Sequence, residues 1–345
     1  MDQSHALWIG SLCVVALGLM FAFSNGFRDS STIVATVVST RALSPPVAFS
    51  LCALAQFLGA LLFGSAVATT IGKLLFGGSL ARTHIDILLT LSAALVATLL
   101  WGVLSWWRAW PTSNNQALFA GLLGSSYASW GAGHLKTPLV LTVLLALILS
   151  PLLGFIASAL LTRLARFVGE WVTPRALPVT RVFHVFFCLL LSFGHGSNDG
   201  QAIMGILVLA MGLAGLWVPE AVGAGAIPPF VRLMVATALG CGVLLGGQRI
   251  LKRLGMSFYR IRPPQGMCAD MASAGTIFLC TLTGLPASTT QVITGSIVGA
   301  GAARSVRAVR WHIAEEIAFS WILTIPAVAL LSAGLCFLFR MGVSG

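Results

Sequence analysis

Long apolar runs, interrupted by a few polar motifs, most strongly constrain how this chain can fold. The runs lie at residues 6–22, 47–71, 85–107, 138–161, 182–192 with its continuation, 203–218, 230–245, 275–282 with its continuation, and 317–339. A helix of roughly 20 apolar residues crosses a hydrocarbon core of roughly 30 Å. Only 8% of the residues are charged, too few to cover a soluble domain. We therefore predict an all-α, polytopic membrane protein with about ten transmembrane elements, several of them broken.

The positive net charge of the chain is explained by the position of its basic residues relative to the membrane. The formal charge of +11 comes mostly from short loops beside apolar runs. Lysine and arginine gather in the cytoplasmic loops of membrane proteins, so this charge does not indicate binding to nucleic acid. The N-terminus has no basic residue before its first apolar run, which favours a retained first helix over a cleaved signal peptide.

Two motifs occur twice in the same order. NGFRD at residues 25–29 corresponds to HGSND at residues 195–199. WPTSNNQALFAGLLG at residues 110–124 corresponds to LPASTTQVITGSIVG at residues 285–299. A recurring pair of motifs indicates a duplicated unit.

The basic clusters predict the relative orientation of the two halves. All of them fall on one side of the membrane only if residues 268–303 enter and return as a hairpin. With an odd number of elements in each half, the second half is then inverted. We predict a first inverted repeat at residues 1–166, a basic cytoplasmic connector at residues 167–181 and a second inverted repeat at residues 182–345. Inverted repeats with interrupted helices and re-entrant hairpins are typical of secondary transporters.

Charged side chains at membrane depth form the first candidate site. Asp29 and Asp199 occupy equivalent positions in the two halves. An ionised side chain inside the membrane is costly and usually belongs to a substrate or ion path. We expect Gly26 and Gly196 to mark points where a helix unwinds and frees backbone groups. The alternative is that Asp29 and its neighbour Arg28 neutralise each other as a structural pair.

The repeated proline motif forms the second candidate site. We expect Pro111 and Pro286 to occupy the first turns of two helices. Hydroxyl and amide side chains follow, at Thr112, Ser113, Asn114 and Asn115 and at Ser288, Thr289 and Thr290. The free N–H groups and positive dipole of a helix start bind anions, although the same residue types are ordinary N-caps. Two such starts facing each other, with two aspartates, suit a protonated oxyanion and its cations.

These residues carry a resemblance to a known family. NGFRDSSTIVATVVSTRAL, GHGSNDGQ and GLPASTTQVITGSIVGAGAAR resemble the duplicated signatures of the inorganic phosphate transporter (PiT) family, particularly its short bacterial members. The similarity extends through nearly the whole chain. It implies a multi-pass protein of the cytoplasmic (inner) membrane that moves inorganic phosphate by symport with Na⁺ or H⁺. It also implies a homodimer in the lipid bilayer, with bound Na⁺ and no other cofactor.

The resemblance and the motifs together predict the binding residues. For phosphate we expect contacts from Arg28, Asp29, Thr112, Ser113, Asn198, Asp199, Ser288, Thr289 and Thr290. For a cation we expect ligands from Asn25, Asp29, Thr32, Ser113, Asp199 and Ser288. We expect no catalytic residue and no metal other than Na⁺.

Several positions depart from the family pattern. Arg28 stands where relatives usually have asparagine or histidine, and Thr32 stands in place of an asparagine. Relatives commonly have asparagine or lysine at Ala202, and a histidine at Gln116 and Gln291. Our hypothesis is that the Arg28 guanidinium supplies the positive charge that a bound cation supplies in relatives.

Other substrates and other classes of protein remain as alternatives. Phosphate retains a proton at neutral pH that an aspartate accepts, whereas sulfate has none, so Asp29 and Asp199 favour phosphate over sulfate. Arsenate shares the chemistry of phosphate. The sequence contains no HExxH, Walker or GxSxG motif, which argues against an enzyme. Accumulation against a gradient distinguishes a symporter from a channel.

Overall fold

The computed structural model describes residues 3–76, 83–134, 137–169, 177–216, 227–246 and 261–344. Its regular structure within these residues is helical, which confirms the predicted all-α class. The first half contains α1 (Gln3–Ser39), α2 (Pro45–Leu62), α3 (Ala66–Phe76), α4 (His84–Trp107), α5 (Asn114–Trp130), η1 (Ala132–His134) and α6 (Thr137–Gly169). The second half contains α7 (Leu177–Leu213), α9 (Pro229–Leu245), α11 (Pro263–Leu282), α12 (Thr289–Arg304), η3 (Val306–Ala308) and α13 (Trp311–Ser344).

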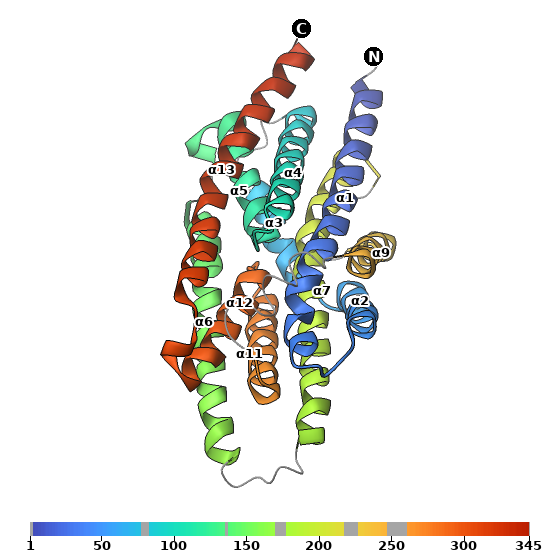
Figure 1. Ribbon diagram of the computed structural model, residues 1–345. Helices are drawn as coiled ribbons and strands as arrows, with labels where there is room; N and C mark the ends of the chain where they lie inside the picture. The colour runs from blue at the N-terminus through green and yellow to red at the C-terminus, as the bar shows by residue number, and fades with distance from the viewer. Residues whose placement is uncertain are drawn as a thin grey trace.

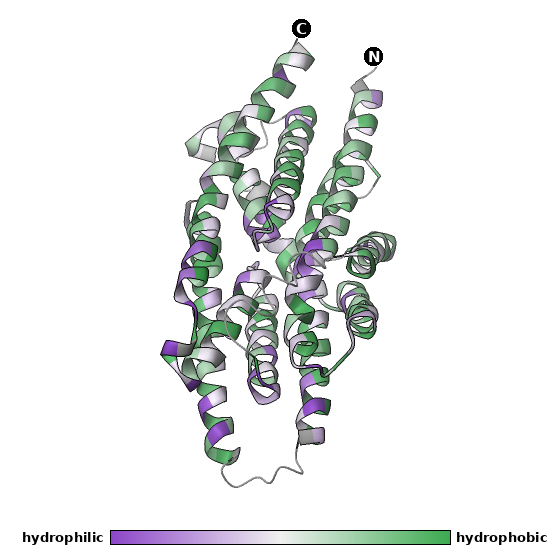
Figure 2. Cartoon of the chain, in the orientation of Figure 1, coloured by the Kyte–Doolittle hydropathy of each residue, from purple (hydrophilic) through white to green (hydrophobic). Residues whose placement is uncertain are grey.

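Several helices have the length and composition of membrane spans. Six described helices meet this criterion: α1, α2, α4, α6, α7 and α13. The apolar helix α9 is shorter. Large apolar side chains such as Leu160 of α6 and Leu330 of α13 are exposed, and Figure 2 shows both helices to be largely hydrophobic. Lipid-facing surfaces have this character. The chain is therefore a multi-pass membrane protein, while the number of about ten crossings stays a prediction.

The two longest helices run without a break through the aspartate motifs. α1 continues across Gly26 and α7 across Gly196, so the prediction that a helix unwinds at these glycines is wrong. The apolar run at residues 182–192 and residues 203–213 of the next run likewise belong to the single helix α7. Each glycine instead permits close helix packing. A Cβ atom at Gly26 would overlap the carbonyl oxygen of Leu239 in α9, and one at Gly196 would overlap that of Gln56 in α2.

The contacts between helices recur when the two halves are exchanged. α1 packs on α9 as α7 packs on α2, and α5 packs on α13 as α12 packs on α6. The pairs α4–α5 and α11–α12 form hairpins whose tips approach each other near the centre of the molecule (Figure 1). In the same view α1 descends while α7 ascends. This arrangement agrees with inverted repeats and with the predicted hairpin at residues 268–303.

The boundaries of the repeats stay a prediction. α6 extends to Gly169 and α7 begins at Leu177, so helices occupy both ends of the predicted connector at residues 167–181. Residues 170–176 of that connector lie outside the described residues.

Candidate functional site

α1 and α7 bring the two predicted aspartates together around a histidine. Asp29 and Asp199 are only 3% and 1% exposed. The Nε2 atom of His195 lies 3.5 Å from Oδ2 of Asp29 and 3.3 Å from Oδ2 of Asp199. His195 precedes Asp199 by one helical turn, so the two side chains share a face of α7. The other ring nitrogen of His195 lies 3.1 Å from Oε1 of Gln56 in α2, which fixes the orientation of the ring.

Side chains from three other helices hold the Asp199 carboxylate. Asn25 of α1 donates a hydrogen bond of 2.9 Å to Oδ2, and Asn115 of α5 donates one of 2.9 Å to Oδ1. Thr289 of α12 donates a longer bond of 3.3 Å to Oδ2. Amide and hydroxyl donors stabilise an ionised carboxylate. Asp199 is therefore a point at which elements of both halves converge.

The Arg28 guanidinium binds the segment before α5. One Nη group donates to Oδ1 of Asn114, and the other donates to Oγ1 of Thr112 at 2.7 Å. A Cβ atom at Gly102 in α4 would lie 3.1 Å from Nη1, so this glycine leaves space for the guanidinium. Both side chains of the expected structural pair are described, and no ion pair joins Arg28 to Asp29. The guanidinium reaches across to α5 instead of along α1, so these two neighbouring charges are not in direct contact.

A chain of hydrogen bonds connects Arg28 to the aspartate of the other half. Asn114 accepts from Arg28 and donates from Nδ2 to Oδ1 of Asn25 at 2.9 Å. Asn25 then donates to Asp199. Each amide accepts through its oxygen and donates through its nitrogen, so all the dipoles point the same way. The guanidinium is thereby linked to Asp199 through two amides.

Asn198 plays the corresponding part in the second half. It stands at the position equivalent to Arg28, directly before the aspartate. Its Oδ1 accepts from the backbone N–H of Ala287 at 3.0 Å, and its Nδ2 donates to Oγ1 of Thr281 at 3.0 Å and to the carbonyl oxygen of Leu285 at 3.3 Å. Both residues therefore fix the segment that leads into a central helix, one with a cation and the other with a neutral amide.

The two central helices begin later than the proline motif predicts. α5 begins at Asn114 and α12 at Thr289, so Pro111 and Pro286 do not lie in the first helical turns. A serine, which is a favoured N-cap residue, stands two positions after each proline, at Ser113 and Ser288, and each helix begins directly after it. Ser113 is the N-cap of α5, and its Oγ accepts from the N–H of Gln116 at 3.2 Å.

The starts of α5 and α12 contact each other directly. Nε2 of Gln291 donates to Oε1 of Gln116 at 2.7 Å, so the two equivalent positions of the repeated motif are bonded to each other. Asn115 also donates to the carbonyl oxygen of Ala287 at 2.9 Å. The expectation that the two helix starts face each other agrees with this geometry.

Several predicted site residues have buried oxygen atoms with free hydrogen-bonding capacity. Within the described residues, Oδ2 of Asp29, Oγ of Ser288 and Oγ1 of Thr290 have no hydrogen-bond partner, and neither does Oδ1 of Asn115. A buried polar atom without a partner destabilises a fold, so such a group of atoms is typical of a ligand site. Thr32 is also buried, but the structure gives it no hydrogen bond to either carboxylate.

The lists of expected phosphate and cation contacts lacked three residues of the site. His195 lies between the two carboxylates, and Asn114 and Asn115, named only as part of the proline motif, carry the hydrogen bonds described above. The repeat contained the necessary signal. His195 is equivalent to Asn25, and the two asparagines are equivalent to Thr289 and Thr290, all of which were predicted as ligands. Applying the equivalence in both directions would have found them.

A further buried carboxylate lies outside this group. Asp270 of α11 accepts from Oγ1 of Thr36, which lies 2.8 Å from each carboxylate oxygen. Its Oδ2 is 3.2 Å from Nε2 of His184 in α7, whose Nδ1 lies 3.4 Å from Oγ1 of Thr40. These contacts connect the last turns of α1 to α7 and α11.

Comparison with known proteins gives consistent matches over most of the chain. Residues 25–332 match the model of a family described as "Phosphate transporter family". A probable low-affinity inorganic phosphate transporter of Rhizobium meliloti is 36% identical over 325 residues, which cover 94% of each chain. A protein of the same description from Bacillus subtilis is 34% identical over 336 residues, covering 97% of this chain and 98% of that protein.

A solved structure shares the fold. It is described as "The sodium-dependent phosphate transporter" and superposes with a TM-score of 0.84 at 23% sequence identity. The match covers 96% of this chain and 99% of the solved one. The arrangement of helices described above is therefore that of a known transporter architecture.

Proposed function

Because this chain belongs to the phosphate transporter family, we propose that it is a secondary transporter that carries inorganic phosphate across the membrane by symport with Na⁺ or H⁺. One observation carries the proposal. Two carboxylates and an imidazole from two long apolar helices meet at the polar starts of α5 and α12, fully enclosed by the protein. Ionisable groups at such depth are typical of substrate and ion paths.

The phosphate is held, in our proposal, by the two central helix starts. The hydroxyl groups of Ser288 and Thr290 have no partner within the described residues and would donate to phosphate oxygens. Oδ2 of Asp29 lacks a hydrogen-bond donor and would accept the proton that phosphate retains at neutral pH. Sulfate has no such proton, so the same oxygen would repel it. This difference supports phosphate over sulfate.

Arg28 acts, in the same proposal, as a fixed positive charge behind the phosphate. Its two Nη groups are engaged by Asn114 and Thr112, which leaves only Nε without a partner. Nη2 also donates to the carbonyl oxygen of Thr112 at 3.4 Å, so both of its N–H groups are directed at Thr112 and not at the substrate. The positive charge instead attracts the anion without direct contact, and the hydrogen-bonded amides of Asn114 and Asn25 are polarised by it.

The coupling cation is assigned to the carboxylates. Ligand atoms of Asp29, His195 and Asp199 lie within 4.8 Å of one another. The carboxylate oxygens, with Oδ1 of Asn115 and the hydroxyls of Ser113 and Ser288, form the hard oxygen set that Na⁺ prefers. A proton would instead be carried by His195 and the two carboxylates, which are in direct contact. We further propose a homodimer in the cytoplasmic membrane, with no catalytic activity.

The decisive experiment is uptake of radiolabelled phosphate into proteoliposomes. Na⁺ and H⁺ gradients are imposed separately, and unlabelled sulfate is the competitor. We expect phosphate to accumulate against its gradient with one cation and to ignore sulfate. Entry of labelled sulfate instead of phosphate would overturn the substrate assignment, and equilibration without accumulation would make the protein a channel.

A further inference from the structure

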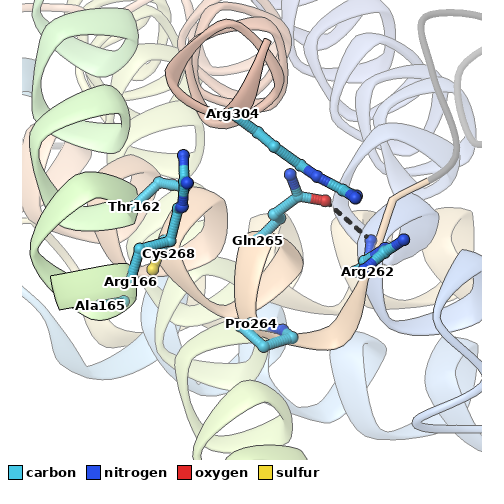
Figure 3. A pocket seen from close by; sticks show the side chains of 8 residues that line it. All are labelled: Thr162, Ala165, Arg166, Arg262, Pro264, Gln265, Cys268 and Arg304. Atoms are coloured by element: carbon cyan, nitrogen blue, oxygen red, sulfur yellow. Dashed lines mark hydrogen bonds between the residues drawn. The ribbon is translucent and has the colours of Figure 1, made fainter. Parts of the chain in front are cut away.

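A cavity of about 470 Å³ lies between α6, α11 and α12, away from the site described above (Figure 3). α12 begins at the candidate phosphate site with Thr289 and ends at this cavity with Arg304. At 1.5 Å per residue, its 16 residues separate the two places by roughly 24 Å. The cavity is therefore not part of the site around the aspartates.

Three arginines from three helices line the cavity. Arg166 comes from α6, Arg262 is the N-cap of α11, and Arg304 lies in the last turn of α12. The lining contains no acidic side chain, and within the described residues none of the three pairs with a carboxylate. Orientation in the membrane alone explains basic residues at the ends of these helices. The arginines by themselves thus define no site.

Gln265 supplies the independent evidence for a ligand. Its side chain is only 5% exposed, and its Oε1 accepts from the N–H of Arg262 at 3.1 Å. This bond fixes the amide, so Nε2 points away from Arg262 and into the cavity, as Figure 3 shows. Nε2 is buried and has no hydrogen-bond partner in the described part of the chain. A buried donor without an acceptor is costly, which indicates that an acceptor group belongs here.

We propose that this cavity is a second anion site, which binds a phosphate group carried by a lipid headgroup or by free orthophosphate. Guanidinium groups match the geometry and charge of phosphate oxygens, and the Gln265 amide adds one oriented neutral donor. Leu164 and Phe167 of α6 are 57% and 67% exposed, so the end of α6 that bears Arg166 also carries exposed apolar side chains. Basic pockets between membrane helices bind lipid headgroups in this way.

Binding to the purified full chain tests the proposal without requiring transport. The probes are dioctanoyl phosphatidic acid and inorganic phosphate, titrated calorimetrically with the protein in phosphatidylcholine nanodiscs. The Asp29→Asn chain is used as the background, because Asp29 is the carboxylate assigned to the transported phosphate, so that orthophosphate binding at the transport site does not obscure the result. A failure of the proposed transport function leaves this readout unaffected.

The key variant is Gln265→Glu, which keeps an oxygen to accept from Arg262 while replacing the donor with a negative charge. We expect it, and the triple variant Arg166→Gln/Arg262→Gln/Arg304→Gln, to weaken binding of phosphatidic acid at least about tenfold. The matched controls Arg163→Gln and Arg307→Gln remove arginines that are also exposed but lie outside the lining, and they should change binding less than about twofold.

Each outcome decides between alternatives. Selective binding of phosphatidic acid supports a lipid headgroup as the ligand, whereas orthophosphate binding that Gln265→Glu removes supports free phosphate. Equal binding by Gln265→Glu and by the two controls would refute the site, as would a native cavity that binds neither probe. Should Gln265→Glu not fold, the exposed Arg304→Gln substitution alone provides the comparison with the controls.

Discussion

The two aspartates of this protein occupy equivalent positions but have different surroundings. Asp199 receives hydrogen bonds from Asn25, Asn115 and Thr289. Oδ2 of Asp29 has no hydrogen-bond partner within the described residues, and Nε2 of His195 lies 3.5 Å from it. Duplication has therefore produced one carboxylate fixed by the protein and one available to a ligand. Equivalence in sequence does not imply equivalence in role.

The residues before the aspartates extend this comparison. Arg28 and Asn198 both fix a segment that leads into a central helix, but only Arg28 brings a charge. Through Asn114 and Asn25 that charge is directed toward Asp199, which belongs to the other half. The residue that differs between the halves, Arg28, is thus also the one whose hydrogen bonds link the first half to the aspartate of the second.

Neutralising each aspartate in turn tests the comparison most severely. Asp199→Asn should lower the initial rate of phosphate uptake at least about 100-fold, because it removes the negative charge that we assign to the coupling cation and places an amide N–H group against the donors around Asp199. It should also lower the thermal unfolding temperature of the protein. Asp29→Asn should abolish uptake with little change in that temperature, since no donor is left unpaired. Uptake and unfolding are measured on the same preparations.

Equal thermal destabilisation by the two substitutions would contradict the assignment of one fixed and one available carboxylate. Native uptake by Asp29→Asn would remove Asp29 from the site altogether.

Making position 28 resemble position 198 sharpens the comparison. Arg28→Asn should reduce uptake about tenfold at a fixed cation concentration, because a positive charge that favours the anion is lost. Higher cation concentration should restore part of the rate if the guanidinium stands in for a cation, whereas Arg28→Ala should abolish uptake. The control is Arg181→Asn, which removes an exposed arginine at the start of α7. Unchanged uptake with unchanged cation dependence would limit Arg28 to holding the segment before α5.

The glycines should behave alike in both halves. Gly26→Ala and Gly196→Ala each force a Cβ atom onto a backbone carbonyl, of Leu239 and Gln56 respectively, so each should lower the free energy of unfolding by about 3 kcal/mol. Gly334→Ala in α13 has open space around its Cβ position and should not destabilise the protein. Denaturant or thermal unfolding in detergent provides the measurement. A large difference between Gly26 and Gly196 would show that the packing of the halves is not equivalent.

The smallest expected effect concerns the contact between the halves. Gln116→Met or Gln291→Met leaves one buried amide unpaired, so each should lower the free energy of unfolding by about 1 to 2 kcal/mol. The double variant should be destabilised by less than the sum of the two, because it removes both polar groups. Strict additivity would mean that the bond contributes nothing to coupling the helices.

Some of this architecture could be predicted from the sequence because it follows from patterns along the chain. The apolar runs predict an all-α membrane protein. The duplicated motifs indicate that Asp29 and Asp199 lie near the starts of two later helices. Local patterns could not predict the continuity of α1 and α7. A glycine at membrane depth serves equally for unwinding and for close packing, and only the neighbour decides. For Gly26 that neighbour is Leu239, far away in the sequence.

The hydrogen-bond partners of the polar side chains could not be predicted from the sequence, for a similar reason. Arg28 and Asp29 are adjacent in sequence and suggested a pair, but consecutive residues on a helix do not face each other. The bond from Arg28 to Thr112 depends on how α1 packs against α5, which no local pattern contains. The two prolines predicted helix starts in the right segments, yet the exact start depended on the hydroxyl residues that follow them.

The bond between Gln116 and Gln291 has a consequence for how access to the site can alternate between the two sides of the membrane. It joins one position of the repeat to its own equivalent, so exchanging the conformations of the two halves maps this pair of residues onto itself, with the donor and the acceptor exchanged. Inward-open and outward-open states related by that exchange would both retain it. The helices can then rock about this point as about a pivot, while contacts such as Arg28–Thr112 and Asn198–Ala287 lie off the axis and are free to differ between the states.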